Sequence, residues 1–203
     1  MAGRNGRDRQ MRERIAQEAA RLMAEDGLRD FLAAKRKAAQ HLGAPATQNM
    51  PRNVEIEAAL AAYQQLFQGD EQSARLAELR RIALEAMEFL ERFQPRLTGS
   101  VLSGTAGAHS DINLHLFAET PEEVGLFLME AHVPFEVGER RLRWSRRDQE
   151  DFPLFRFVAG DTVVELLVFP VKGLRQAPLS PVDGKPMKRA SQNALEALIA
   201  AHG

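Results

Sequence analysis

The chain has 203 residues, and its 27 Lys and Arg residues nearly balance its 28 Asp and Glu residues, for a formal net charge of −1. That balance excludes a strongly basic, histone-like nucleic-acid binder, although local basic clusters remain. The absence of cysteine excludes disulfides, thiolate zinc sites, iron–sulfur clusters and cysteine nucleophiles.

The sequence predicts no membrane-spanning helix, because it has no run of about 18 apolar residues. The basic N-terminal residues 1–14 are followed by IAQEAARLMAEDG, in which charges interrupt the apolar residues. This pattern argues against a secretory signal. We therefore expect a cytoplasmic protein with no membrane partner.

Helical spacing dominates the chain up to Pro95. Residues 1–10 are rich in Gly, Arg and Asn, and we expect them to be disordered. The apolar spacing that follows predicts four helices, over about 15–26, 28–42, 51–67 and 71–94.

After Pro95 the pattern becomes that of strands. Asp111–Ala118 (DINLHLFA) alternates with period two, and Thr162–Phe169 (TVVELLVF) is rich in apolar and β-branched residues. Thr120-Pro121-Glu122-Glu123 has the capping residue, proline and acids of a helix start. Further strands are predicted over 96–98, 134–144 and 152–158, and a last helix around Leu195.

These elements predict an α+β protein in which an N-terminal helical region precedes a mixed β-sheet flanked by helices. The predicted divisions are a helical region over 1–95, an α/β core over 96–172, and a basic tail with a C-terminal helix over 173–203.

The chemistry-bearing residues gather within 99–114. Gly99-Ser100 follows a short strand, among small residues whose backbone amides can approach a phosphate. Asp111 and Asn113 lie two apart on a predicted strand, so alternation places both side chains on one face. Glu165 is an isolated carboxylate in an apolar strand, and its burial is costly unless it is paired or binds a cation.

The string GSVLSGTAGAHSDINL resembles the signature of the nucleotidyltransferase superfamily, the polymerase-β-like fold. That signature comprises Gly-Ser, a later Gly, and Ser-Asp-hydrophobic-Asp-hydrophobic on the next strand, with a third carboxylate from a later strand. The resemblance covers roughly residues 96–170. The matching positions are Gly99, Ser100, Gly104, Ser110, Asp111, Ile112 and Leu114, with Glu165 as the candidate third acid.

The resemblance implies a transfer of a nucleoside monophosphate from a nucleoside triphosphate to a hydroxyl, with Mg²⁺ or Mn²⁺ as cofactor. It implies Asp111, Asn113 and Glu165 as catalytic, metal-binding residues. It also implies that a nucleotide is bound by Gly99, Ser100, Gly104 and Ser110. Lys185 and Lys188, in the basic tail, are our candidates for neutralising the phosphates, from their proximity in sequence alone. RNA, a protein or a small molecule would be the acceptor.

Asn113 departs from the signature, which has a second Asp at that position. An amide oxygen can ligate Mg²⁺ but adds no charge, so the carboxylate set is incomplete. Two main hypotheses follow. One is an active nucleotidyltransferase, and the other is a catalytically degenerate module that keeps the fold and binds nucleotide, RNA or a protein partner. A third is a structural or regulatory protein with a Gly-rich loop.

Other motifs leave further alternatives open. His109 and His115, together with Asp111 and Glu165, could form a metal site with nitrogen and oxygen ligands. A basic cluster between Arg140 and Arg147 surrounds the single Trp and could hold phosphates and stack a base. No Gly-x-Ser-x-Gly elbow is present, which argues against a serine hydrolase.

The N-terminal helices loosely resemble the opening of a tetracycline-repressor-type DNA-binding domain. RERIAQEAARLMAEDGLRDF is similar to its first helix and KRKAAQHLGAP to its second. The segment that should form the recognition helix, ATQNMPRN, carries a Pro and no apolar period. We therefore expect a helical cap or an oligomer surface rather than a DNA reader.

Overall fold

The computed structural model describes residues 2–45, 47, 49–67, 69–145 and 148–201. The chain divides into two compact units, which are considered separately. The first unit runs to Ser73 and includes 107–109 and 181–183. The second holds 74–106, 110–180 and the residues from Gly184 onward. The domain limits expected at residues 95 and 172 stay a prediction.

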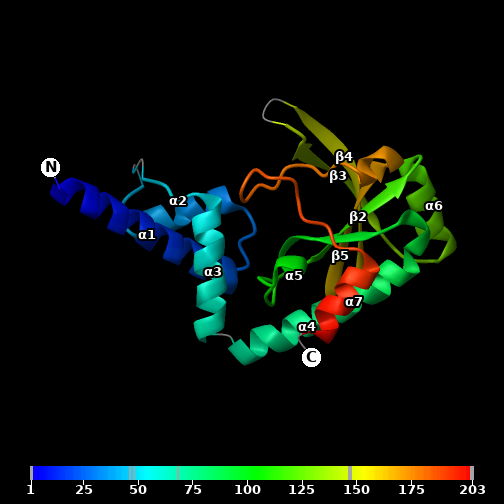
Figure 1. Ribbon diagram of the computed structural model, residues 1–203, viewed down its shortest axis with the longest axis horizontal. Coiled ribbons are helices and arrows are strands. Elements are labelled where there is room, and N and C mark those ends of the chain that lie inside the picture. The colour runs from blue at the N-terminus through cyan, green and yellow to red at the C-terminus, as the bar shows by residue number, and fades with distance from the viewer. Residues whose placement is uncertain (1, 46, 48, 68, 146–147, 202–203) are drawn as a thin grey trace. The chain divides into compact units, whose positions relative to one another are not determined.

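Helices form most of the first unit (Figure 1). They are α1 (Ala2–Glu25), α2 (Phe31–His41) and α3 (Asn53–Phe67). Their core is small and rich in alanine: Ile15 and Leu22 of α1, Ala38 of α2 and Ile56 of α3 are almost completely buried. Alanines at these crossings let the helix axes approach closely.

Two helix starts differ from the sequence-based expectation. α1 begins at Ala2, so much of the segment expected to be disordered is helical. An i,i+4 ion pair between Arg9 and Glu13 lies in the N-terminal half of this helix. α2 begins at Phe31 because the Asp30 side chain accepts a hydrogen bond from the amide of Ala33, 2.6 Å away.

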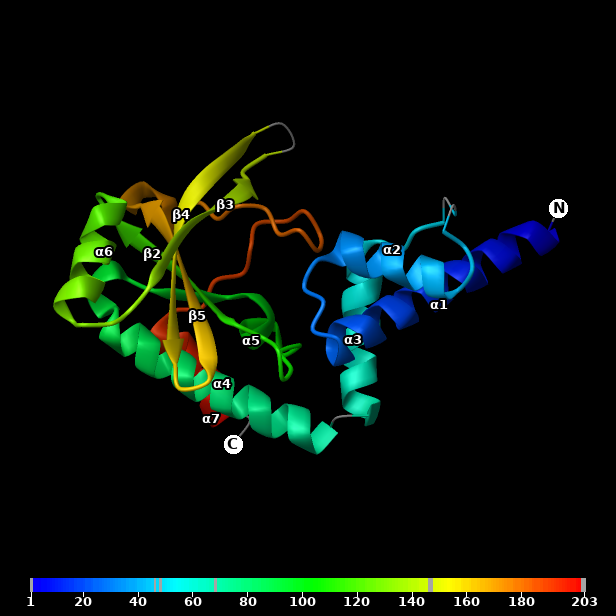
Figure 2. The same cartoon turned by 180° about the vertical axis from the view of Figure 1, so that it is seen from behind.

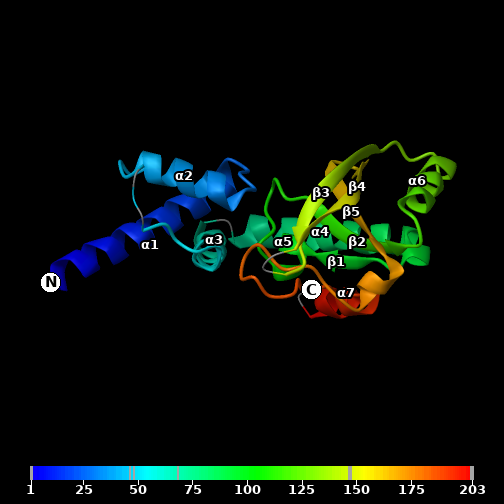
Figure 3. The same ribbon diagram turned by 90° about the horizontal axis from the view of Figure 1, so that it is seen from above.

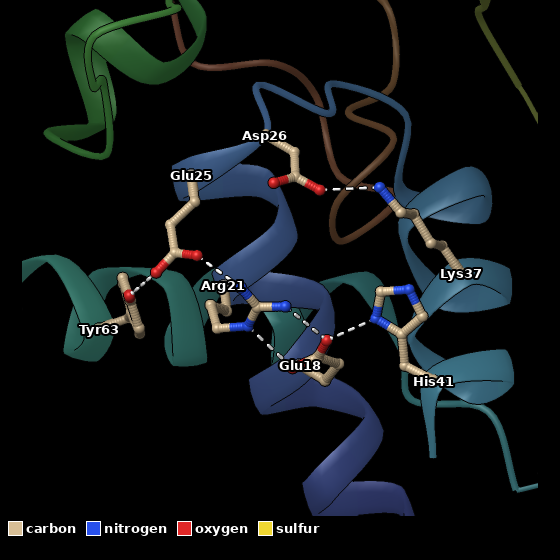
Figure 4. A network of polar contacts seen from close by, with 7 residues as sticks. All are labelled: Glu18, Arg21, Glu25, Asp26, Lys37, His41 and Tyr63. Carbon is tan, nitrogen blue, oxygen red and sulfur yellow. Dashed lines mark hydrogen bonds and ion pairs between the residues drawn. The ribbon is translucent and has the colours of Figure 1, made fainter. Parts of the chain in front are cut away.

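A network of charged and polar side chains joins the three helices of the first unit (Figure 4). The Glu18 carboxylate accepts from Arg21 at 2.8 Å and contacts His41 of α2 at 2.8 Å. Arg21 also binds Glu25, which accepts a hydrogen bond from Tyr63 of α3. The pKa of Glu18 is lowered to about 2, chiefly by the Arg21 hydrogen bond. These contacts tie α1 to both of its neighbours.

The second unit is built on a five-stranded mixed sheet of order β1-β2-β5-β4-β3. The central pair, β2 and β5, is parallel, and the other neighbouring pairs are antiparallel. The strands are β1 (Arg96–Thr98), β2 (Ile112–Ala118), β3 (Glu136–Arg143), β4 (Gln149–Ala159) and β5 (Thr162–Pro170). The remaining elements are α4 (Gly69–Phe89), η1 (Glu91–Phe93), α5 (Gly99–Ser103), α6 (Pro121–Glu130), η2 (Val171–Leu174) and α7 (Gln192–Ala200).

Helices α4, α6 and α7 cover one face of this sheet with apolar side chains (Figure 2). Leu114 of β2 and Leu166 of β5 are fully buried on that face. They pack in one cluster with Met87 of α4, Leu128 of α6 and Leu195 of α7. The alternation of both strands leaves their other side chains on the opposite, second face.

The α+β class predicted from the sequence is confirmed. The predicted start of α6 is confirmed in detail: the side chains of Thr120 and Glu123 exchange hydrogen bonds with each other's backbone amides in a capping box. Across the described residues, no helix combines the length and apolar character that crossing a membrane requires.

Leu114→Ala tests the helix-covered core. We expect it to lower the free energy of unfolding by about 2–5 kcal/mol, because it removes buried methyl groups and leaves a cavity. Leu126→Ala is the matched control, because Leu126 is 58% exposed and should change stability by less than about 0.5 kcal/mol. Denaturant titration measures both, and equal effects would contradict this account of the core.

Candidate functional site

A row of polar side chains crosses the second face of the sheet. Each of the five strands contributes one residue through direct Cα pairing: Thr98 with Asn113, Asn113 with Glu165, Glu165 with Arg156, and Arg156 with Glu136. We call these residues the polar row. Polar residues at matching positions of neighbouring strands are brought within contact distance by the sheet register.

Glu165 is the buried centre of the polar row. Its side chain is only 6% exposed, and each of its carboxylate oxygens accepts a charge-assisted hydrogen bond from an arginine. Arg140 Nη2 donates to Oε2 at 2.6 Å, and Arg156 Nε donates to Oε1 at 2.8 Å. Arg156 comes from the neighbouring strand, whereas Arg140 comes from β3 at the sheet edge.

Burial raises the pKa of Glu165, but hydrogen bonds and charge from Arg140 and Arg156 outweigh burial, and the pKa lies below its usual value. The carboxylate is therefore ionised at neutral pH, and its charge is met by two guanidinium groups.

Asn113 joins the same cluster. Its Oδ1 accepts a hydrogen bond from Arg140 Nη1 at 3.1 Å, and its Nδ2 donates to the carbonyl oxygen of Asp111 at 3.3 Å. Gly99 lies beside it: a side chain built at Gly99 would have its Cβ 3.6 Å from Asn113 Nδ2. Gly99 has a φ of +74°, so a larger residue here would be strained. The structure thus brings Gly99, Asp111, Asn113 and Glu165 into one neighbourhood.

The other residues predicted to bind nucleotide lie elsewhere. Ser100 is half-buried, and its carbonyl oxygen accepts from the amide of Gly104, which ends α5 with a φ of +86°. Gly104 lies nearer Arg80 of α4 than the polar row. Ser110 is half-buried just before β2.

Lys185 and Lys188 are exposed, on the segment between η2 and α7. No hydrogen bond or ion pair described for the second unit joins either lysine to Asn113 or Glu165.

His115 lies on the second face, two residues from Asn113, and is 3% exposed. Its Nδ1 accepts a hydrogen bond from Arg189 Nε at 3.0 Å. Since a guanidinium only donates, Nδ1 carries no proton and the ring is neutral. Burial, followed by the charges of Arg189 and Arg140, lowers the pKa of His115 to about 3.

The histidine metal set considered from the sequence is divided between the two units. His109 belongs to the first unit, in which its carbonyl accepts a hydrogen bond from Arg29 at 2.8 Å, whereas His115 and Glu165 belong to the second. Within the residues that the structure describes, no three His, Asp or Glu side chains cluster in a way that could hold a metal ion.

The donor set around Glu165 does not fit a divalent cation as it stands. Both oxygens of its carboxylate, and the amide oxygen of Asn113, accept hydrogen bonds from arginine. A Mg²⁺ ion needs oxygen ligands at about 2.1 Å and would have to displace two cations from this carboxylate. Magnesium or manganese therefore stays a prediction from the resemblance.

Arg156 and Arg140 are the functional candidates that the sequence analysis missed in these roles. A usable signal was present, because Arg156 is the one charge in FPLFRFVA just as Glu165 is in TVVELLVF. Opposite charges on two apolar strands joined by a tight turn favour a cross-strand pair. No comparable pattern in the neighbouring residues predicts that Arg140, on the edge strand, contacts Glu165.

The basic cluster around Trp144 is only partly described, because Arg146 and Arg147 lie outside the described residues. Trp144 itself packs edge-on against Phe152 and Phe169, and its Nε1 donates to Glu150 at 2.9 Å. Its ring is therefore part of the packing of the fold.

No protein-family model and no curated protein sequence matches the chain. Any function of this site therefore has to be inferred from the motif and from the geometry of the second face.

Glu165→Gln tests the charge at the centre of the polar row. The substitution keeps the shape but removes the charge that two guanidinium groups share, and we expect it to lower the free energy of unfolding by about 1–3 kcal/mol. Glu136→Gln at the exposed end of the row is the control, and we expect it to be close to neutral. If both variants unfold like the wild type, the arginine pairs contribute no net stability.

His115 should make stability depend on pH. Its folded-state pKa, about 3, lies below the usual 6.5, so the unfolded chain binds the extra proton between these values. Proton binding by the unfolded chain therefore lowers the free energy of unfolding as the pH falls below about 6.5. The loss is up to about 1.4 kcal/mol per pH unit, and above about pH 6.5 this contribution to stability is fully present.

His115→Gln keeps a hydrogen-bond acceptor and cannot titrate. Urea titration of both proteins between about pH 5 and 7 avoids the range in which most carboxylates titrate. We expect the wild type, but not the variant, to lose stability toward pH 5, and parallel curves would show that His115 is not held neutral.

Proposed function

We propose that the second unit is a catalytically degenerate, nucleotidyltransferase-like module that binds the phosphates of a nucleotide without a divalent metal. The observation that carries this proposal is the pair of guanidinium groups, Arg140 and Arg156, on the single buried carboxylate of the polar row. Two fixed positive charges stand where the resemblance implies metal ions.

The order of elements supports the nucleotidyltransferase-like part of the proposal. Gly99 opens a short helix directly after β1, Asp111 immediately precedes β2, and Glu165 lies on the strand parallel to β2. In the superfamily signature, the Gly-Ser pair, the first Asp and the third acid occupy the positions that correspond to Gly99-Ser100, Asp111 and Glu165. Asn113 and Glu165 are directly paired, as a shared site requires.

The arginines retain capacity for an anion. Their side chains are 35% and 45% exposed, so the guanidinium groups reach solvent. Arg140 uses Nη1 and Nη2, and Arg156 uses Nε, in the contacts described above. A guanidinium has five N–H donors, and the remaining ones match the paired oxygens of a phosphate.

Transfer chemistry is less favoured by this arrangement. Two-metal catalysis depends on carboxylates that neutralise the metal ions and orient the attacking oxygen. Here Asn113 supplies no charge and the Glu165 charge is already met by arginine. A metal-dependent transferase, our other sequence-based hypothesis, is retained as the alternative outcome of the experiment.

The experiment is a thermal-shift titration of the full chain with ATP, GTP, CTP and UTP, each with and without Mg²⁺ or Mn²⁺. A ligand that binds only the folded state increases the free energy of unfolding and therefore raises the unfolding midpoint. At a ligand concentration about a hundred times the dissociation constant, the increase is about 2.7 kcal/mol. We expect a shift with at least one nucleotide that does not need the metal.

The variant Arg140→Ala/Arg156→Ala should lose that shift. Arg141→Ala is the matched control, because Arg141 neighbours Arg140 on β3 but is paired with Asp151, outside the polar row. A shift that requires metal and disappears in Glu165→Gln would support the transferase instead. No shift at millimolar nucleotide would reject a nucleotide site.

A further inference from the structure

Arg80 occupies a core position of α4. Leu79, Ala83 and Met87 lie on the face of α4 that packs against the sheet, and their side chains are completely buried. Arg80 is itself only 5% exposed, although an arginine is rarely buried without a charged partner. A buried cation among these apolar residues therefore needs a physical explanation.

The guanidinium group of Arg80 has almost no partners. Its Nε donates to the carbonyl oxygen of Val101 in α5 at 3.4 Å, close to the upper limit for a hydrogen bond. Its Nη1 and Nη2 make no hydrogen bond or ion pair with the residues that the structure describes. Burial lowers the pKa of Arg80, and no carboxylate of the described residues counteracts this effect. The guanidinium stays protonated at neutral pH, so a buried positive charge is left without neutralisation.

The unpaired nitrogens of Arg80 lie beside the loop that ends α5. Helices α4 and α5 lie next to each other (Figure 3), and a Cβ built at Gly104 would be 3.9 Å from Arg80 Nη2. Gly104 has a φ of +86° and no side chain, so nothing at this position blocks the approach to Nη2. Its neighbours Ser103 and Thr105 carry hydroxyl groups 3.0 Å apart. The loop thus brings small and hydroxyl-bearing residues, and no carboxylate, to the guanidinium.

The fold holds this loop in a fixed position. α5 follows β1, which pairs with β2 on one side. On the outer edge of β1, Leu97 exchanges backbone hydrogen bonds of 2.9 Å with Ala190. The amides of Gly104 and Thr105 both donate to the carbonyl oxygen of Ser100, which closes α5. A preformed loop of this kind lowers the entropic cost of binding a small ligand.

We infer that Arg80 and residues 103–105 form a binding site for a phosphate group, separate from the polar row. A guanidinium presents parallel N–H donors that match two oxygens of a phosphate, and Nη1 and Nη2 of Arg80 are available for this role. The phosphate supplies the negative charge that the fold itself does not place beside Arg80. Since Arg80 is nearly enclosed, the site suits a small anion such as inorganic phosphate.

This site is independent of the proposed function. The polar row lies on the second face of the sheet, whereas α4 packs against the helix-covered face. The resemblance implies nucleotide contacts at Gly99 and Ser100, which open α5, and residues 103–105 lie at its other end. Binding of phosphate by Arg80 can therefore succeed or fail whatever the polar row binds.

Isothermal titration calorimetry of the full chain with inorganic phosphate, in chloride buffer, tests this inference. We expect the wild type to bind phosphate and Arg80→Met to bind it at least about tenfold more weakly, because the variant loses the charge and its forked donors. Arg81→Met is the matched control and should bind like the wild type, because Arg81 is exposed and paired with Glu78 and Glu85. AMP is the second probe: heat that also depends on Arg80 shows that the site accepts a phosphate ester as well as free phosphate.

Equal phosphate binding by Arg80→Met and the wild type would overturn the inference, because the phosphate would then occupy another site. Absence of binding by the wild type at about 10 mM phosphate would also overturn it, and would indicate that water satisfies Nη1 and Nη2. If Arg80→Met does not fold, Arg80→Lys carries the same comparison. The lysine keeps the charge but loses the forked donors, so it should also bind phosphate more weakly than the wild type.

Discussion

The burial of a carboxylate in the middle of a β-sheet is the constraint on which the second face depends. An ionised group that is removed from water must be neutralised and hydrogen-bonded at both oxygens. Glu165 meets this need with Arg156 on the adjoining strand and Arg140 from the sheet edge. Arg140 in turn binds Asn113, so the positions of Arg156, Arg140 and Asn113 follow from the need to neutralise one carboxylate.

Arginine and a metal ion solve the same electrostatic problem with different consequences. A bound metal can leave, and its occupancy follows the metal concentration, whereas a guanidinium is a permanent part of the chain and stays charged at any physiological pH. With Asn113 in place of the expected second Asp, two arginines face one carboxylate, which leaves one positive charge in excess. Both departures from the nucleotidyltransferase signature are therefore consistent with the proposed binding of an anion.

The pattern of neighbouring residues predicted many of the helices and strands of this fold. The contacts of the candidate site depend instead on how distant segments pair. The alternation in residues 111–118 and the apolar, β-branched composition of residues 162–169 predicted both central strands. The alternation also placed Asn113 on a face with other polar residues. The start of α6 after its N-cap residue Thr120 was also predictable from a few neighbouring residues. The partners of Glu165 were not, because strand order and the reach of Arg140 depend on how distant segments pair. Arg189 donates a hydrogen bond to His115, which lies 74 positions earlier in the sequence, and no short-range pattern predicts such a contact.

The pairing of Leu97 with Ala190 has a consequence for the order in which the sheet is completed during synthesis. β1 leaves the ribosome before the segment that covers its outer edge, because Ala190 follows Leu97 in the chain. Until then the edge of β1 exposes unsatisfied amide and carbonyl groups, which are a template for pairing with another nascent chain. Protection of this sheet edge against aggregation is thus deferred until the segment around Ala190 has been synthesised.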